Sequence, residues 1–265
     1  MFAVEVSGVT VRRGDRRILN AVDLALPEGI TALLGPNGSG KTTLLRTLVN
    51  DMERESGSVS VHGHDFSTGN GRSALPRTVG YLPQTFDFWP HFTVRETLLY
   101  IAWIKGVPRR DRMSEAQRAG EAFGLGRHMD ARMKTLSGGT VRRVGIAQAV
   151  LGGPRLLLLD EPAAGLDPAQ RAAMREAVVA LAAQGRSVVL STHLVDDLAD
   201  YCRHVVVLRG GRVAFSGTAS AFLRLGGDPL SGGTAEAAYA AALLGPGAGP
   251  RAAAAAGTEG DGRAR

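Results

Sequence analysis

Gly35-Pro36-Asn37-Gly38-Ser39-Gly40-Lys41-Thr42 is the stretch that decides the fold. It matches the pattern G-x-x-x-x-G-K-[ST] of a phosphate-binding loop. The apolar run Ile30–Leu34 before it predicts a buried central strand, and a helix is expected from Lys41 to Val49. Because glycines let successive N–H groups turn inward and the helix start adds its positive end, this turn is suited to wrap a phosphate chain.

The side chains of this loop divide between phosphate and metal binding. Lys41 is expected to reach the β- and γ-phosphates, and the Thr42 hydroxyl is expected to bind Mg²⁺. The predicted nucleotide-binding residues of the loop are Gly35, Pro36, Asn37, Gly38, Ser39, Gly40, Lys41, Thr42 and Thr43.

Two acidic residues follow the apolar run Leu156–Leu159, which predicts a second buried strand. Asp160 is expected to hold Mg²⁺ through water, and Glu161 to act as general base on the attacking water. An isolated Asp-Glu pair is more often a charge pair at a helix start. The position at the tip of an all-Leu strand, over a hundred residues after the phosphate loop, favours the catalytic interpretation.

A second loop-then-helix pattern occurs at Leu136–Gly139. Ser137 and the N–H groups of Gly138 and Gly139 at a helix start predict a second anion site. Taken alone, Ser-Gly-Gly is usually a flexible turn, and its recurrence at 231–233 is interpreted as part of the tail.

The pattern of strands and helices predicts an α/β fold, a P-loop NTPase core with a parallel sheet, an antiparallel N-terminal β subdomain and an inserted α-helical subdomain at about 85–150. Residues 1–225 are predicted to form this domain. The Ala/Gly/Pro-rich residues 226–265 are predicted to be a largely disordered tail, with one short helix at Ala235–Leu244.

A capping box formed by Thr93 and Glu96 predicts that a helix starts at Thr93. The expected strands are 4–11, 22–26, 30–34, 80–82, 156–159, 187–191, 204–208 and 213–215, and further helices are expected at about 109–123, 139–151, 169–183 and 194–201.

Composition narrows the class of protein. The chain has 265 residues with 44% hydrophobic residues, no apolar run of about 18 residues and a single cysteine. Its N-terminus lacks a secretory layout, so a cytoplasmic location is expected. The net charge of +6 suggests nucleic acid, anionic lipid or a phosphorylated ligand as partner, but the basic residues are scattered.

Six motifs together resemble the nucleotide-binding domains of ATP-binding cassette transporters over about residues 3–225. They are the phosphate loop, Gln84 in Tyr81–Gln84, Leu136–Gly139, Asp160-Glu161, Gly165–Pro168 and Ser191–His193, in the family's order. The resemblance implies ATP and Mg²⁺ as ligands. It also implies head-to-tail pairing with a second copy of the chain or a related cassette, with ATP between the phosphate loop of one and Ser137–Gly139 of the other. It also implies that Gln84 links Mg²⁺ and water to the helical insert, that Asp167 crosses the dimer seam and that His193 contacts the γ-phosphate.

Some positions depart from the family pattern. Thr140 replaces a common Gln, Ala163 replaces a usual Thr, and Arg13 stands where many cassettes have an aromatic residue that stacks on adenine. Arg13 is therefore a candidate base-binding residue, with a solvated turn arginine as the alternative. The segment Arg142–Gln148 is similar to exporter-type cassettes that serve separate permeases.

The sequence thus predicts an ATP-hydrolysing subunit that powers a separate membrane permease, as an exporter, on the inner face of the plasma membrane. The alternatives are a soluble cassette ATPase acting on nucleic acid or ribosomes, and a catalytically inactive cassette; no nucleic acid partner is expected. Phe86, Phe88, Trp89 and Phe92, directly after Gln84, either belong to the core or line a groove for a permease helix. The predicted catalytic residues are Glu161, His193, Lys41 and Gln84, and the predicted metal site comprises Thr42, Gln84 and Asp160.

Overall fold

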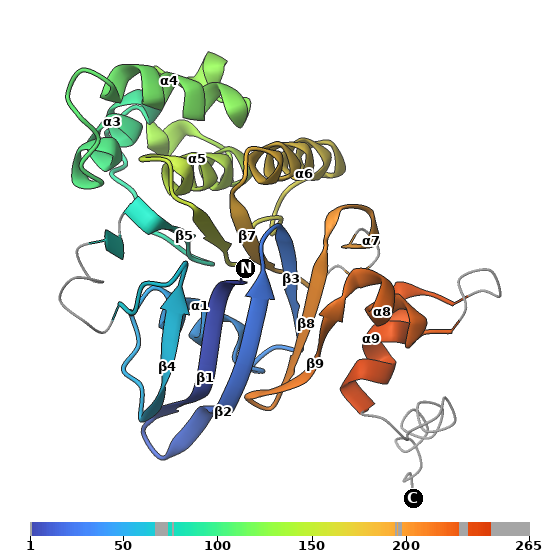
Figure 1. The fold of residues 1–265 in the computed structure, drawn as a ribbon. Helices are drawn as coiled ribbons and strands as arrows, with labels where there is room; N and C mark the ends of the chain where they lie inside the picture. Colours follow the sequence, from blue (N-terminus) through green and yellow to red (C-terminus); the bar gives the residue numbers. More distant parts are fainter. Residues whose placement is uncertain are drawn as a thin grey trace, which may run out of the picture.

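Two sheets form the framework of the protein (Figure 1). The computed structural model describes residues 2–66, 74–75, 77–193, 195, 198–227 and 233–244. The antiparallel sheet has the order β2-β1-β4, with β1 Phe2–Arg13, β2 Arg16–Pro27 and β4 Ser56–Val61. The larger sheet has the order β5-β6-β7-β3-β8-β9, with β5 Val79–Leu82, β6 Leu156–Leu159, β7 Ser187–Ser191, β3 Ile30–Leu34, β8 His204–Arg209 and β9 Arg212–Thr218. All neighbours in it are parallel except β8 and β9.

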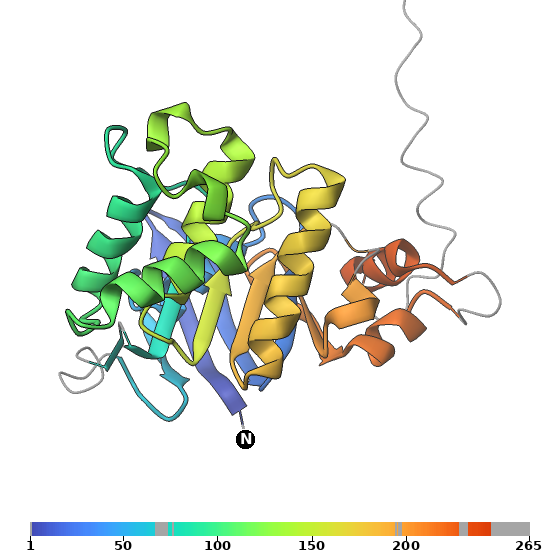
Figure 2. The same ribbon diagram turned by 90° about the horizontal axis from the view of Figure 1, so that it is seen from above.

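Helices cover both faces and both ends of the larger sheet. In Figure 2, α3 and α4 lie at one end of the molecule and α8 and α9 at the other. The helices are α1 Lys41–Leu48, α3 Val94–Ile104, α4 Arg112–Ala122, α5 Gly138–Val150, α6 Pro168–Ala183, α7 Leu198–Tyr201, α8 Ala219–Arg224 and α9 Ala235–Leu244, with short 3-10 turns η1 Gly126–His128 and η2 Met133–Thr135.

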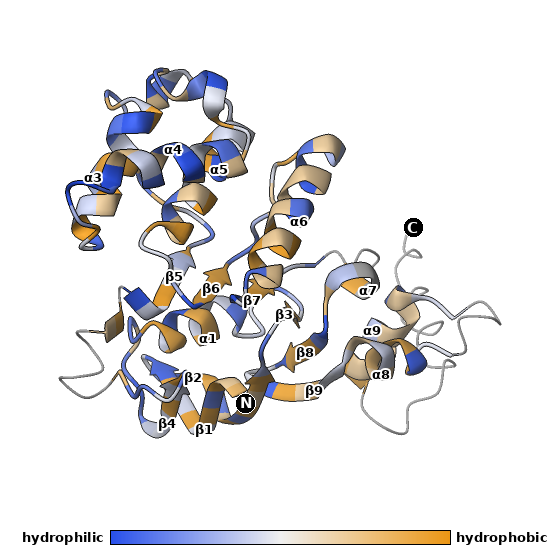
Figure 3. Cartoon of the chain, turned by 45° about the horizontal axis from the view of Figure 1, so that its top comes forward, coloured by the Kyte–Doolittle hydropathy of each residue, from blue (hydrophilic) through white to orange (hydrophobic). Residues whose placement is uncertain are grey.

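The buried strand β6 shows how the sheet divides the core. Its four leucines are all fully buried, and successive side chains of a strand point to opposite faces. Leu156 and Leu158 pack with α1 and the small sheet, whereas Leu157 and Leu159 pack with the helices of the other face. Figure 3 shows β6 and β7 as hydrophobic strands between these layers. A strand without alternation is therefore apolar because both of its faces are covered.

The structure confirms the predicted α/β fold and most of its elements, including the capping box, in which Glu96 N donates to Thr93 Oγ1 and Thr93 N donates to Glu96 Oε2. Strand β4 and helix α8 were not predicted. Helix α7 begins at Leu198, and residues 194, 196 and 197 of its predicted start lie outside the described residues.

The predicted short helix Ala235–Leu244 is present as α9, which packs against α8 with Ala238 and Ala242 buried. Packed structure therefore continues beyond position 226. The division between residues 1–225 and a tail stays a prediction, and residues 245–265 lie outside the described part of the chain. None of the helices in that part has the length and hydropathy needed to cross a membrane.

Candidate nucleotide site

The phosphate loop leads directly into α1. Gly40 precedes the helix with a φ of 108°, in the region that favours glycine, and no side chain caps the helix start. The first N–H groups of a helix have no partner within the helix. The start of α1 is therefore open to an anion, as the loop pattern predicts.

Neighbouring strands hold the loop in place. A Cβ atom on Gly35 would collide with the Leu208 carbonyl oxygen and the Ser39 hydroxyl, so only glycine fits there. Gly211 N, in the β8–β9 turn, donates to Ser39 O at 3.0 Å. The position of the loop is thus fixed by the larger sheet.

Lys41 is buried and folds back on its own loop. Its Nζ donates to Gly35 O at 2.7 Å and to Pro36 O at 3.4 Å. The buried Ser39 Oγ has no hydrogen-bond partner among the described residues. Both groups can donate to an oxygen-rich ligand. The two contacts of Lys41 are to neutral carbonyl oxygens, so a ligand that binds its ammonium breaks no ion pair.

Asp160 directly follows β6 and is fully buried. Its Oδ1 accepts a hydrogen bond from Ser191 Oγ at 2.6 Å, while its buried Oδ2 has no partner among the described residues. An unpartnered buried carboxylate oxygen is costly unless a cation or water satisfies it. Oxygen ligands are those that Mg²⁺ prefers, so Asp160 together with Thr42 and Gln84 fits the predicted metal.

Glu161 follows with a φ of 50°, rare for a residue other than glycine. Its N–H donates to Ser191 Oγ at 2.7 Å, and its Oε2 lies 3.0 Å from His193 Nδ1. The Glu161 side chain is 13% exposed and that of His193 is 67% exposed. Ser191 therefore orients both acidic residues, and His193 orients the Glu161 carboxylate.

Most of these groups surround one cavity of about 360 Å³, although the predicted site residues Gly35, Pro36 and His193 do not line it. Its lining residues are Arg16, Ile18, Asn37, Gly38, Ser39, Gly40, Lys41, Thr42, Thr43, Gln84, Asp160 and Glu161. An anion cradle, oxygen ligands for a cation and a carboxylate base thus meet in one space. That arrangement can bind a polyphosphate and deprotonate a water beside it.

Ser137, Gly138, Gly139 and Asp167 do not line this cavity. Ser137 caps α5, since its Oγ accepts a hydrogen bond from Thr140 N at 3.3 Å, and Gly138 is exposed with open space around its Cα. Asp167 caps α6 in the same way through Gln170 N at 2.8 Å. All four predicted residues therefore lie apart from the phosphate loop of their own chain.

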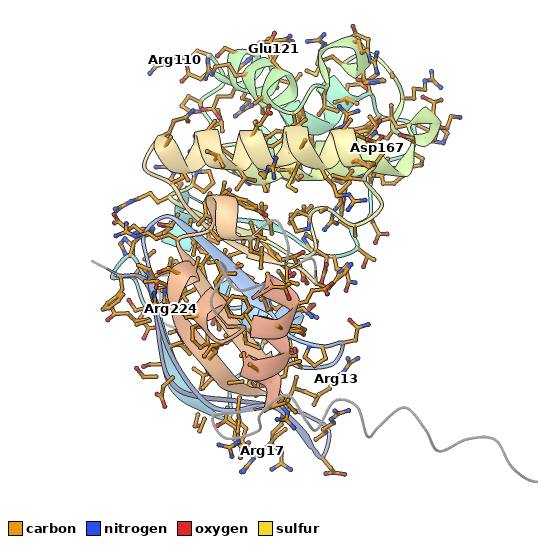
Figure 4. All side chains as sticks on the ribbon, turned by 90° about the vertical axis from the view of Figure 1, so that its right-hand side faces the viewer. Arg13, Arg17, Arg110, Glu121, Asp167 and Arg224 are labelled. Atoms are coloured by element: carbon orange, nitrogen blue, oxygen red, sulfur yellow. The ribbon has the colours of Figure 1, made fainter. Side chains whose placement is uncertain are left out.

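Arg13 is also absent from the cavity lining, whereas Arg16 belongs to it. The two residues are directly opposite each other across the β1–β2 pair. Figure 4 shows Arg13 at the edge of the molecule, and its side chain is exposed. The sequence analysis missed Arg16, because the family pattern drew attention to position 13 alone.

Arg142 is a further residue that the sequence analysis did not assign to the site. It is buried within α5, and its guanidinium donates to four backbone carbonyls: those of Pro83 and Gln84 at 2.8 Å, Glu161 at 3.0 Å, and Asp160. One side chain therefore joins the helix behind Ser137 to the Gln84 loop and to the acidic end of β6. The signal in the sequence was an arginine among the apolar positions of the expected helix that follows Gly139.

The aromatic residues after Gln84 divide into two groups. Phe86 and Phe88 pack on the core, as the core interpretation predicts. Trp89 is 41% exposed. Its ring centroid lies 4.7 Å from that of Tyr100, in an edge-on contact, and 5.5 Å from that of Phe92. The ring centroids of Tyr100 and Trp103 are 5.7 Å apart. We call Trp89, Phe92, Tyr100 and Trp103 the aromatic cluster. Its first member, Trp89, follows the cavity residue Gln84 by five positions in the sequence.

Comparison with known proteins gives a consistent picture. The family model described as ABC transporter matches residues 19–164. The chain is 34% identical over 223 residues to the Nod factor export ATP-binding protein I of Rhizobium sp. (strain N33), covering 83% of this chain and 72% of that protein. It is 39% identical over 202 residues to the molybdenum import ATP-binding protein ModC of Pseudomonas syringae pv. tomato, covering 74% and 55%. A solved structure of an ATP-binding subunit of an ABC transporter superposes with a TM-score of 0.80 at 28% identity, covering 91% of this chain and 99% of that one.

Proposed function

The chain belongs to the ABC transporter family as an ATP-binding protein, an ATPase coupled to transport, and we propose that it drives a separate membrane permease in the export direction from the cytoplasmic face of the plasma membrane. ATP hydrolysis by this chain is supported most directly by one cavity, which is lined by the phosphate loop, by Asp160 with its unpartnered Oδ2 and by Glu161. The Nod factor export relative and the segment Arg142–Gln148 favour export, whereas the relation to ModC favours import.

Each group around the cavity has a role in hydrolysis. The loop N–H groups and Lys41 bind the β- and γ-phosphates, and Thr42, Gln84 and Asp160 hold Mg²⁺, which neutralises phosphate charge when bound. Glu161 accepts a proton from water as the water oxygen attacks the γ-phosphorus in line. The bond to the β,γ-bridging oxygen breaks, and ADP leaves with the electron pair. His193 keeps Glu161 oriented and contacts the γ-phosphate.

A second copy of the chain completes the site. The exposed start of α5 offers Ser137 Oγ and the Gly138 N–H to an anion, but it lies outside the cavity of its own chain. Head-to-tail pairing brings it against the γ-phosphate bound by the partner, and Asp167 lies along the same seam. Arg142 then acts as a positioning residue, because it joins this helix to the Gln84 loop and to the backbone of Glu161.

Trp89 and Phe92 of the aromatic cluster form the proposed docking surface for the permease. Trp89 and Phe92 follow Gln84 within a few residues, so a helix seated on them senses the loop that lines the cavity. Exposed aromatic side chains are enriched at protein interfaces, because they bury large areas on contact.

Co-purification and reconstitution test this function. The tagged chain is expected to co-purify from membranes with a protein of about six membrane-spanning segments, and the pair in vesicles is expected to export solute with ATP. Trp89→Ala is expected to uncouple transport while the isolated chain keeps its ATPase activity and melting temperature, and Trp89→Phe serves as the matched control. Co-sedimentation with ribosomes or nucleic acid instead of a membrane protein contradicts the proposal.

A further inference from the structure

Exposed apolar side chains are concentrated where α3 turns into α4. Among the described residues, eight large hydrophobic side chains are exposed, and three of them lie within residues 103–113: Trp103 and Ile104 at 55% and Met113 at 54%. We call residues 103–113 the α3–α4 corner. Trp103 contacts Tyr100 of the aromatic cluster, so the corner adjoins the proposed permease-docking residues Trp89 and Phe92.

The cations of this corner divide into inward and outward groups. Lys105 Nζ donates to three carbonyls at the end of α5, and Arg112 Nε donates to Val107 O at 2.8 Å, so these two brace the corner from inside. Arg109 and Arg110 are exposed. Arg110 has an 86% exposed side chain with only a 3.5 Å contact to Asp111, and Arg109 forms no hydrogen bond or ion pair with the described residues.

We propose that the α3–α4 corner binds the headgroup region of an anionic membrane beside the permease. Trp103, Ile104 and Met113 supply apolar side chains of the kind that insert at the boundary between headgroups and acyl chains. Arg109 and Arg110 pair with lipid phosphates, since basic residues next to an anionic leaflet are attracted to it. The corner is braced by Lys105 and Arg112, so contact with the lipid requires no rearrangement. This inference rests on the proposed function only because the permease brings the chain to a membrane.

The two tryptophans of the chain make the test direct. Trp89→Phe leaves Trp103 as the sole tryptophan, so its fluorescence reports the corner alone. Without any permease, vesicles of equal phosphatidylglycerol and phosphatidylcholine are expected to pellet the protein and to shift Trp103 emission to shorter wavelength. Pure phosphatidylcholine vesicles are expected to do neither. Absence of pelleting with the anionic vesicles at low salt overturns the proposal, as does pelleting without a change in Trp103 emission.

A matched pair of variants separates local contact from net charge. Each basic residue near an anionic surface contributes about a fivefold gain in partitioning, so Arg109→Ala with Arg110→Ala is expected to lower partitioning by about 25-fold. Arg224→Ala removes an exposed arginine in the other half of the molecule, as Figure 4 shows for Arg110 and Arg224, and is expected to change it less than twofold. Equal losses contradict the proposal. The ATPase activity of the isolated chain is expected to stay unchanged in all these variants, so a failure here is distinct from a failure of the proposed ATPase site.

Discussion

The starts of α1 and α5 both have glycines beside them, before the first helical residue in α1 and at the first two helical positions in α5, but they differ in structure. The start of α1 has no side-chain cap, is buried, and opens into a cavity with acidic residues on its far side. The start of α5 is capped by its own Ser137, is exposed, and does not line that cavity. The starts of both helices can therefore bind an anion, but the start of α1 lies in a cavity with further site residues, whereas the start of α5 is exposed.

The difference indicates how the two ends work together. Of the two ends, only that of α1 shares a cavity with the proposed base Glu161 and with oxygen ligands, so we place the chemical step there. In the proposed head-to-tail pairing, the α5 end contributes to a nucleotide bound by another chain. Arg142 connects the two in one chain, because it extends from α5 to the backbone of Glu161.

Removal of the base has the largest expected effect on activity. Glu161→Gln keeps the size of the side chain but cannot accept the proton from water, so turnover is expected to fall about 10²–10⁴-fold while ATP affinity stays close to that of the wild type. Steady-state ATPase assays and calorimetric titration measure the two quantities. Lys41→Ala is the contrast, because it is expected to lose nucleotide binding itself. Wild-type turnover in Glu161→Gln rejects the role.

Loss of the connection between the two ends comes next. Arg142→Met leaves the carbonyls of Pro83, Gln84, Asp160 and Glu161 without their shared donor, so the free energy of unfolding is expected to fall by about 2–3 kcal/mol. Turnover is expected to fall about 10–100-fold with little change in KM, because Glu161 is misplaced. Arg143→Met, which breaks contacts to the carbonyls of Phe123 and Gly124, is the control and is expected to spare turnover. Equal turnover in the two variants contradicts the positioning role.

The far end of α5 has a pH-dependent anchor. Burial lowers the pKa of the Lys105 ammonium from its ordinary 10.5 to about 8. Between these values the unfolded chain binds the proton and the folded chain does not, so the contribution of Lys105 makes the free energy of unfolding rise with pH from about 8 to 10.5. At about 1.4 kcal/mol per pKa unit, the rise over this interval amounts to up to about 3.5 kcal/mol. Chemical unfolding of wild type and Lys105→Met across this range measures it, and parallel curves for the two proteins contradict the assignment.

The cap of α5 has the smallest expected effect on stability. Ser137→Ala removes the acceptor for Thr140 N, which is expected to cost about 1 kcal/mol, or about 2–4 °C in Tm. Ser137→Asp retains a cap and is expected to melt like the wild type. Its carboxylate repels a partner's γ-phosphate, however, so ATPase activity is expected to fall sharply. Normal activity in Ser137→Asp shows that α5 does not contact a nucleotide.

Short-range patterns explain why so much of this fold was predictable. The all-leucine strand β6 and the capping box at Thr93 are local signals, and the structure confirms both. Strand β4 was missed because only Val59 and Val61 alternate there, within Ser and Gly, and its pairing with β1 is set by contacts remote in sequence.

In the candidate site, too, local patterns were predictable from the sequence and tertiary contacts were not. The loop, Asp160 and Glu161 were found because their spacing determines their geometry, and the structure places them on one cavity. Arg16 was not predicted, and Ser191 and Arg142 belonged to recognised motifs without a predicted site role. Such roles depend on tertiary contacts, which join residues 18 to 59 positions apart in the case of Arg142. The exposure of Trp89 also depends on packing, since Phe86 in the same stretch is partly buried against α5.

The state of association of Glu161→Gln tests most directly whether one chain completes the site of another. By sedimentation velocity, this variant is expected to be a monomer alone and a dimer with saturating ATP. Gly138→Asp in the same background has room for its side chain in the monomer, so its melting temperature is expected to hold while the new carboxylate keeps it monomeric with ATP. If Glu161→Gln binds ATP and stays monomeric, or if the Gly138→Asp double variant dimerises equally well, the start of α5 is not the missing half of the site.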